Sequence, residues 1–150
     1  MSTETIKIDK TLDIKAVMAA LWDAANKQAI IMPAAPTNVQ IGAFMGVFNA
    51  NQVKLSDNFD GTKSYFDQLA IVTAGPGYVK VDGAVEVGDL LEFSATVAGS
   101  FTKRTYKNLN ATFSDTEIEA EILKQAALPR IKVQEKATAA KTIKVLVGSI

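Results

Sequence analysis

The residues best suited to hold a cation lie in the stretch 56–67, where Asn58, Asp60 and Asp67 surround a central glycine. Calcium loops place carboxylates and amides at alternate positions before such a glycine and close on a bidentate glutamate. Here the first position holds a serine, the last holds an aspartate, and Lys63 adds a positive charge. We therefore interpret the stretch as a polar turn, with a calcium site at Asn58, Asp60 and Asp67 as the alternative, and expect no cofactor.

The sequence contains no His and no Cys. Catalytic triads that need either residue are therefore excluded, and so are ordinary zinc sites. Carboxylate chemistry stays open through Asp57 and Asp60, but no sequence feature pairs them with a cleft. A small carboxylate hydrolase is thus the third hypothesis, and we predict that the protein is not an enzyme and has no catalytic residues.

The chain has 150 residues, of which 48% are hydrophobic, so it can bury a core of its own. Sixteen basic and sixteen acidic residues cancel, whereas a nucleic-acid binder normally carries a basic face. No signal peptide and no apolar run of about 20 residues is present. We expect a soluble protein made in a cytoplasm that binds neither nucleic acid nor membrane.

The sequence pattern of the N-terminal part predicts an extended segment followed by a helix. Ile6 and Ile8 alternate with polar neighbours, which indicates that residues 1–10 form an edge strand of the chain's own sheet or an arm that pairs with a neighbouring subunit. Apolar residues at helical spacing then predict an amphipathic helix over 12–28. Trp22 lies in this apolar stripe, where core packing is the first interpretation and an interface anchor the second.

A proline-containing connector and a hairpin follow. The connector, 29–38, is apolar, so Met32 and Pro33 are candidate partner contacts beside the alternative that the segment packs across the domain. Residues 39–55 predict a β-hairpin, in which Gly42 and Gly46 mark bulges or close approaches of the backbone.

The rest of the chain predicts short strands, tight turns and one helix. A buried strand at 68–73 precedes a Gly-Pro-Gly turn at 75–77, and polar turns then separate further strand candidates. A capping box formed by Ser114 and Glu117 predicts a helix as far as residue 128. Its apolar stripe would consist of Ile118, Ile122, Leu123 and Ala126, although apolar and acidic residues also alternate there as they do in a strand. The strand candidates after the Gly-Pro-Gly turn are 78–81, 90–97, 101–107, 130–135 and 142–148.

These elements indicate an α+β fold that is mainly β. We expect a small antiparallel β-barrel or sandwich with an N-terminal amphipathic helix and a second short helix near 115–128. The predicted organisation is an arm or edge strand at 1–10 and a single domain at 11–150, with a C-terminal β-module at 75–150.

Residues 77–147 resemble the compact β-domains of capsid decoration (cement) proteins and head-fibre bases of tailed bacteriophages. That family follows a strand with a small-residue turn, the motif Val-x-x-Gly-Asp-Leu, a strand, a Gly turn, a Lys- and Thr-containing strand, and a closing apolar strand. The corresponding stretches here are 79–83, 85–91, 98–103 and 142–147. The family has little structure between the last two strands, whereas this chain inserts residues 106–128 there.

The resemblance implies a structural virion protein that binds the outside of a phage capsid as a homotrimer, with the major capsid protein as its partner. Candidate contact residues, selected only because we expect them to be exposed, are Ile6, Ile8, Trp22, Met32 and Pro33. The virion surface would then be its location. A tail, baseplate or fibre-adaptor protein, or a carbohydrate-binding β-module, is the alternative.

Overall fold

A computed structural model describes residues 2–9, 12, 14–51, 68–107 and 112–148. Within this part of the chain lie nine strands and two helices. In chain order they are β1 (Ser2–Lys7), β2 (Ala19–Asp23), β3 (Gln28–Ile31), α1 (Asn38–Gly42), β4 (Phe44–Phe48), β5 (Gln68–Val81), β6 (Leu91–Phe93), β7 (Phe101–Lys103), α2 (Asp115–Ala127), β8 (Ile131–Val133) and β9 (Lys141–Val147).

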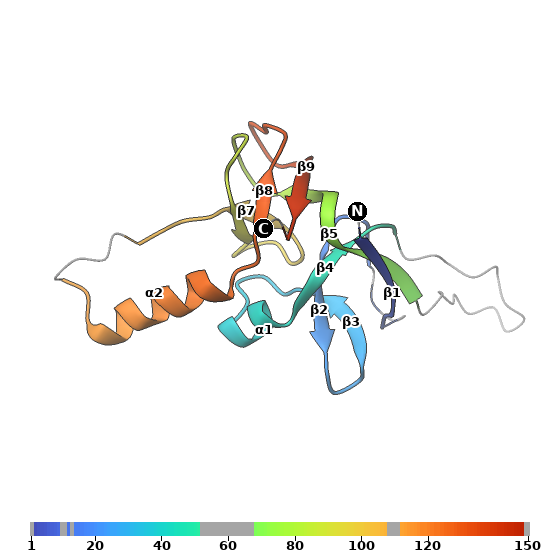
Figure 1. Ribbon diagram of the computed structural model, residues 1–150, viewed down its shortest axis with the longest axis horizontal. Coiled ribbons are helices and arrows are strands. Elements are labelled where there is room, and N and C mark those ends of the chain that lie inside the picture. Colours follow the sequence, from blue (N-terminus) through green and yellow to red (C-terminus); the bar gives the residue numbers. More distant parts are fainter. Residues whose placement is uncertain (1, 10–11, 13, 52–67, 108–111, 149–150) are drawn as a thin grey trace, which may run out of the picture.

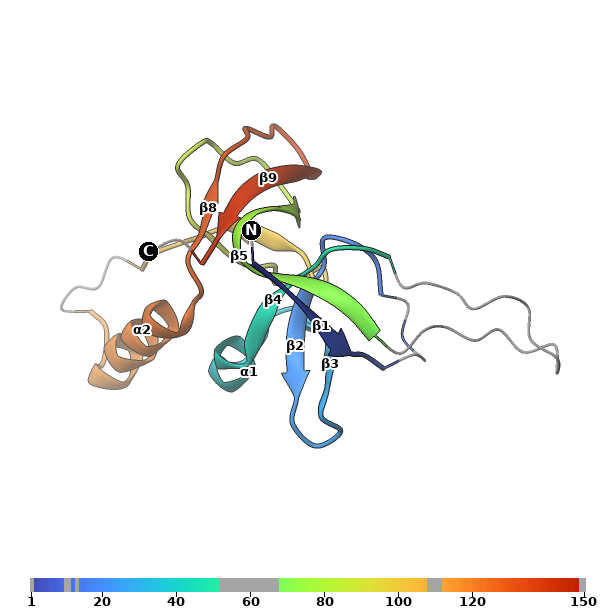
Figure 2. The same ribbon diagram turned by 45° about the vertical axis from the view of Figure 1, so that its right-hand side comes forward.

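The strands are organised around β5, which has 14 residues and takes part in two groups of strands (Figures 1 and 2). Its first half pairs with β1 and β4, and β4 continues through β2 to β3. Its second half pairs along its length with β9, which pairs with β8, and meets β7 at Val81. All of these ladders are antiparallel except the contact between β5 and β7.

The first group of strands is covered on both faces. Val47 and Val72 belong to the larger hydrophobic cluster, whereas their chain neighbours Phe48 and Ile71 belong to a second cluster. Because successive strand residues point to opposite faces, this assignment places one cluster on each side of β4 and β5. Strands buried in this way are apolar without alternation.

The helix expected over 12–28 is wrong. The chain instead forms β2, a turn and β3, and both Val17 and Lys27 have positive φ angles (68° and 52°) that a right-handed helix does not allow. The side-chain amide of Asn26 donates a 2.8 Å hydrogen bond to Asp23 across the turn. The first three residues of β2 are all buried, so the strand lacks the alternation of a half-exposed strand. Together with apolar residues outside the strand, they happen to have the spacing of a helical apolar stripe.

The second group of strands follows the expected alternation. Val79 and Val81 of β5 are buried, as are Ile143, Val145 and Val147 of β9, whereas the residues between them point outward. The strand candidates at 78–81, 130–135 and 142–148 are therefore confirmed in kind, although β8 is shorter than expected. The strands expected at 90–97 and 101–107 are likewise shorter, ending at Phe93 and Lys103.

The Gly-Pro-Gly segment at 75–77 does not reverse the chain, contrary to expectation, because β5 runs through it. Gly75 has a φ of 90°, which glycine adopts without steric cost. Here β5 exchanges one partner for another: Ala74 pairs with β1 and Gly75 pairs with β9. The segment thus marks the transition between the two groups of strands.

The turn at 85–89 forms as its residues predict. Gly88 has a φ of 93°, and the Asp89 carboxylate accepts a 2.9 Å hydrogen bond from the Glu86 N–H. The hairpin expected over 39–55 is only partly correct, because its first residues form α1 instead of a strand. Its second arm, 52–55, lies outside the described residues.

The coarse fold class is confirmed, since the structure is a mostly antiparallel sheet with two helices. The sheet is not closed into a barrel: only one isolated bridge among the described residues, between Ile8 and Ala29, joins the segment after β1 to β3. The finer description as a barrel or sandwich stays a prediction. No helix in the described part of the chain is both long and apolar enough to cross a membrane.

Replacing Gly46 should destabilise the fold strongly. A Cβ at this position would lie 2.3 Å from the Val72 carbonyl oxygen, and φ is +144°. We expect Gly46→Ala to lower the free energy of unfolding by at least about 2 kcal/mol, because backbone of a central strand must move. Gly42→Ala is the matched control, since a Cβ added to Gly42 would meet no atom within 4 Å. Equal denaturant midpoints for the two variants would contradict this.

Candidate partner-binding cleft

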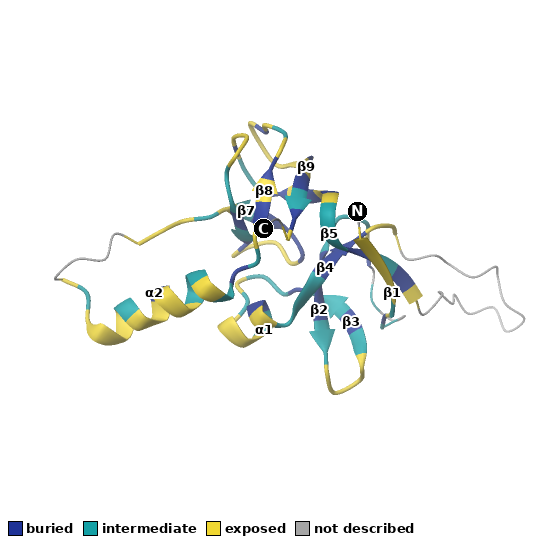
Figure 3. Cartoon of the chain, viewed as in Figure 1, coloured by how far each residue is buried: buried dark blue, intermediate teal, exposed yellow. Residues whose placement is uncertain are grey.

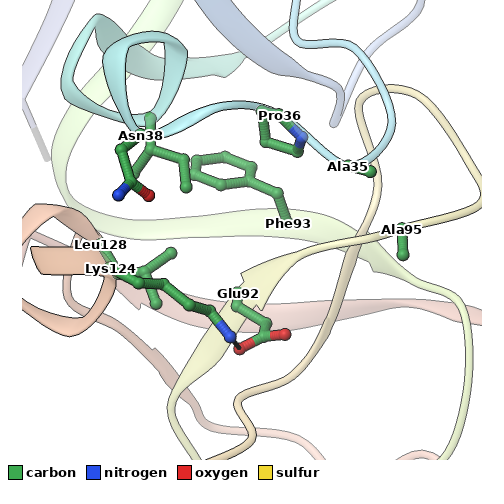
Figure 4. A pocket seen from close by; sticks show the side chains of 9 residues that line it. Ala35, Pro36, Asn38, Glu92, Phe93, Ala95, Lys124 and Leu128 are labelled. Carbon is green, nitrogen blue, oxygen red and sulfur yellow. Dashed lines mark ion pairs between the residues drawn. The ribbon is translucent and has the colours of Figure 1, made fainter. Parts of the chain in front are cut away.

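A cleft of about 170 Å³ lies where α1, α2, the connector and the region of β6 meet (Figure 4). These segments are far apart in sequence. Its lining combines apolar side chains with one acidic, one basic and one amide side chain. The lining residues are Ala35, Pro36, Asn38, Ile41, Glu92, Phe93, Ala95, Lys124 and Leu128.

The connector is fixed to the end of β6, and this placement forms one wall. The Ala35 N–H donates to the Ser94 carbonyl at 2.9 Å. Thr37 then caps α1 through a capping box: its hydroxyl accepts from the Gln40 N–H at 3.3 Å, and its own N–H donates to the Gln40 side chain at 2.9 Å. This cap holds Asn38 and Ile41 at the cleft.

The floor is apolar and supported from behind by aromatic rings. Phe93 contacts Phe44 edge-on with ring centroids 5.3 Å apart, and its centroid lies 5.2 Å from that of Phe101. Ile41 and Leu128, which also line the cleft, are buried. Interlocked rings of this kind resist rearrangement. The space is of the size that one aliphatic or aromatic side chain fills.

One wall of the cleft is charged. Glu92 and Lys124 form an ion pair with a nitrogen–oxygen distance of 3.2 Å, marked by the dashed line in Figure 4. The same carboxylate accepts a 3.1 Å hydrogen bond from the Thr105 N–H. An apolar floor beside polar groups is the arrangement that receives an anchoring side chain of a protein partner.

The helix expected near 115–128 is confirmed as α2, with the capping box of Ser114 and Glu117 in place. Its expected apolar stripe, however, does not face the body of the protein. Ile122 and Leu123 are 59% and 53% exposed, and Ala126 is also exposed. The inward-facing residues are Glu121, Lys124, Gln125 and Leu128.

Polar contacts therefore hold α2 in place. Glu121 is buried and accepts hydrogen bonds from the Gln125 side chain at 2.9 Å and from the Lys107 N–H at 3.3 Å. Gln125 also donates to the Thr105 carbonyl at 3.0 Å. The Gln125 hydrogen bond is the largest cause that lowers the pKa of Glu121, and the Lys107 N–H and the charges of Lys124 and Lys107 act in the same direction against desolvation.

Arg104 joins the two ends of the segment 105–128 that contains α2, which we call the excursion. Its guanidinium donates to the Pro129 carbonyl at 2.8 Å and to the Leu91 carbonyl at 3.3 Å. Lys103 is in an ion pair with Asp89 at 3.7 Å. Part of the basic segment at 103–107 therefore has a structural role.

The five predicted contact residues occupy different environments. Ile8 and Met32 are almost completely buried, which corrects the exposure on which their selection was based. Ile6 and Pro33 are half-buried, and Ile6 packs against the second hydrophobic cluster. Trp22 is half-buried near the tip of the β2–β3 hairpin. None of them lines the cleft.

The calcium alternative at Asn58, Asp60 and Asp67 lies outside the described residues, and so does Asp57. In the ranges that the structure describes, no group of three or more acidic side chains is arranged to hold a metal ion.

Sequence reasoning missed the cleft, whose side chains come from separate segments. One local signal was available: Thr37 and Gln40 have the spacing of a capping box, and this pattern could have placed a short helix beside the connector. Nothing local indicates that Glu92, Phe93 and Lys124 meet.

Comparison with protein-family models found none that matches the chain, and comparison with curated proteins likewise found no match.

Residues 2–9 belong to the body of the protein, because β1 pairs with β5 and Ile8 is in the core. We expect Ile8→Ala to lower the free energy of unfolding by about 2–5 kcal/mol, the usual range for such a cavity. Thr3→Ala, at an exposed position of β1, should change it by less than about 0.5 kcal/mol. Chemical denaturation measures both, and an Ile8→Ala variant as stable as the parent would show that β1 is a detachable arm.

Acid should loosen α2 through Glu121. A carboxylate with a lowered folded-state pKa stabilises the fold fully above its ordinary value of 4.5, and this stabilisation is lost as the pH falls through the lowered value. Amide hydrogen exchange across α2 should therefore be faster in Glu121→Gln than in the parent at pH 6, and the difference should disappear at sufficiently low pH. Glu119→Gln, on the opposite side of the helix, is the control. A difference that does not depend on pH would contradict the assignment.

Proposed function

We propose that this chain is a structural virion protein that binds the outer surface of a phage capsid as a decoration protein and acts by binding instead of catalysis. The first support is the resemblance of residues 77–147. The stretches that carry it form the turn at 85–89, β6, β7 and β9, and these lie in one contiguous group of strands with the second half of β5.

The cleft between α1 and α2 is the observation that carries the proposal. Both helices that border it also present large apolar side chains to solvent, among them Val39, which is 84% exposed, and Leu123. Figure 3 shows that most of α1 and α2 is exposed. Apolar side chains gathered on protruding elements indicate a surface that binds another protein. A cleft that admits one side chain supplies the anchor for the shell, and Val39 on α1 supplies contact area beside it.

The proposed partners are the major capsid protein and other copies of this chain, arranged as a homotrimer on the virion surface. A single cleft of this size gives a weak contact. Three linked copies on a repeating shell bind much more tightly than one, since each further contact forms at a high effective concentration.

Blocking the cleft should weaken shell binding. Ala95 lines the cleft and is exposed, so a tryptophan there fills the space without entering the core. In co-sedimentation with expanded, undecorated shells of the phage that encodes the chain, we expect Ala95→Trp to bind at least tenfold more weakly, equivalent to about 1.4 kcal/mol. Ala139→Trp, exposed in the segment between β8 and β9, is the matched control.

Saturable binding of the parent protein at a fixed number of copies per capsomer would support the proposal. Absence of binding to such shells, combined with binding to purified tail or baseplate particles or to a glycan array, would overturn it and favour the alternative functions. Equal shell affinity for the parent and Ala95→Trp would remove the cleft from the binding surface.

A further inference from the structure

Two C-terminal segments of this chain carry net charges of opposite sign, although the chain as a whole has a net charge of zero. α2 contains four acidic residues and one basic residue, whereas the segment 130–147, which includes β8 and β9, contains five basic residues and one acidic residue. Local fields of opposite sign on one molecule favour contact between copies.

The outward face of α2 is both acidic and apolar. Ile122 and Leu123 are exposed there together with Asp115 and Glu119. The helix's basic residue, Lys124, is turned inward and engaged with Glu92. In the part of the chain that the structure describes, neither Asp115 nor Glu119 has an ion-pair partner.

The outer face of β5, β9 and β8 has the complementary composition. Tyr78 is 55% exposed and lies directly opposite Lys144, and the half-buried Leu146 lies opposite Lys132. Lys80 extends the same face. Considering described residues alone, the ammonium groups of Lys80, Lys132 and Lys144 form no ion pair, whereas Lys103, Lys124, Lys136 and Lys141 do.

The two faces also match in size. A helix of 13 residues is about 20 Å long at 1.5 Å per residue. β9, with seven residues, extends about 23 Å at 3.3 Å per residue. Within one chain α2 extends away from β9 in both views (Figures 1 and 2), so the outward face of α2 is free to meet another copy.

We propose that the outward face of α2 in one copy docks on the outer face of β5, β9 and β8 in a second copy. Ile122 and Leu123 contact Tyr78 and Leu146, while the acidic side chains of the helix approach the lysines of the sheet. The contact is heterologous, so it repeats from copy to copy and closes into a ring when the rotation permits. This interface deepens the proposed function, because it rests on the self-association that a decoration homotrimer requires.

Charge reversal on each face tests the interface with the full-length protein. Sedimentation velocity over a concentration series, at about 50 mM and 500 mM salt, should show oligomers that weaken at high salt, since exposed charges are screened. Lys132→Glu with Lys144→Glu should weaken association at least tenfold, and so should Asp115→Lys with Glu119→Lys. Combining all four reversals should restore most of the loss.

The exposed ion pair of Glu86 and Lys136 provides the matched control. Both residues lie outside α2, β5, β8 and β9. Glu86→Lys and Lys136→Glu make the same kinds of charge change and should leave association unchanged, with circular dichroism confirming that every variant is folded. A protein that stays monomeric at all concentrations, an oligomer insensitive to both reversals, or failure of the combined variant to recover would each overturn the interface.

The same variants separate this inference from the proposed function. Self-association that depends on both faces, together with no affinity for shells, would leave the interface standing and reject the decoration role. Shell binding by a protein that is monomeric in solution and unaffected by the reversals would support the decoration role and reject the interface.

Discussion

The register of β5 is the constraint on which the remaining structure depends. This strand supplies residues to both hydrophobic clusters and pairs with β1, β4 and β9 along its length. A shift by one residue would exchange Ile71 with Val72 between the clusters and turn Lys80 into the core. A side chain at position 46 would collide with the Val72 carbonyl, so Gly46 allows β4 to lie close against β5. The placement of the cleft and of both helices follows from this alignment.

A strand was recognised most readily from the sequence where one of its faces is exposed. β9 alternates lysine or threonine with buried Ile and Val, so its pattern identifies it directly. β2 is enclosed by two strands and by both clusters, so the alternation is missing and the spacing suggested a helix. Local periodicity records the exposure of a strand and not its pairing.

The cleft was harder to predict from the sequence than the strands were. α2 could be located from its capping box, but its orientation could not, because Glu121 and Gln125 face inward while Ile122 and Leu123 face outward. The polar contacts that bury one side of α2 are made with residues remote from it in sequence, such as Thr105. The total charge of zero concealed the opposite signs of the two C-terminal segments, and only the strand pairing shows that the lysines share a face.

The bond from Arg104 to the Pro129 carbonyl has an evolutionary consequence. It joins the two ends of the excursion that carries α2, so this link between the ends of β7 and β8 does not itself depend on the length of the segment between them. The entropic cost of a loop grows only slowly with its length. Recombination can therefore lengthen, shorten or exchange this excursion while the β-sheet stays intact, and the chain can acquire a new binding partner without a new fold.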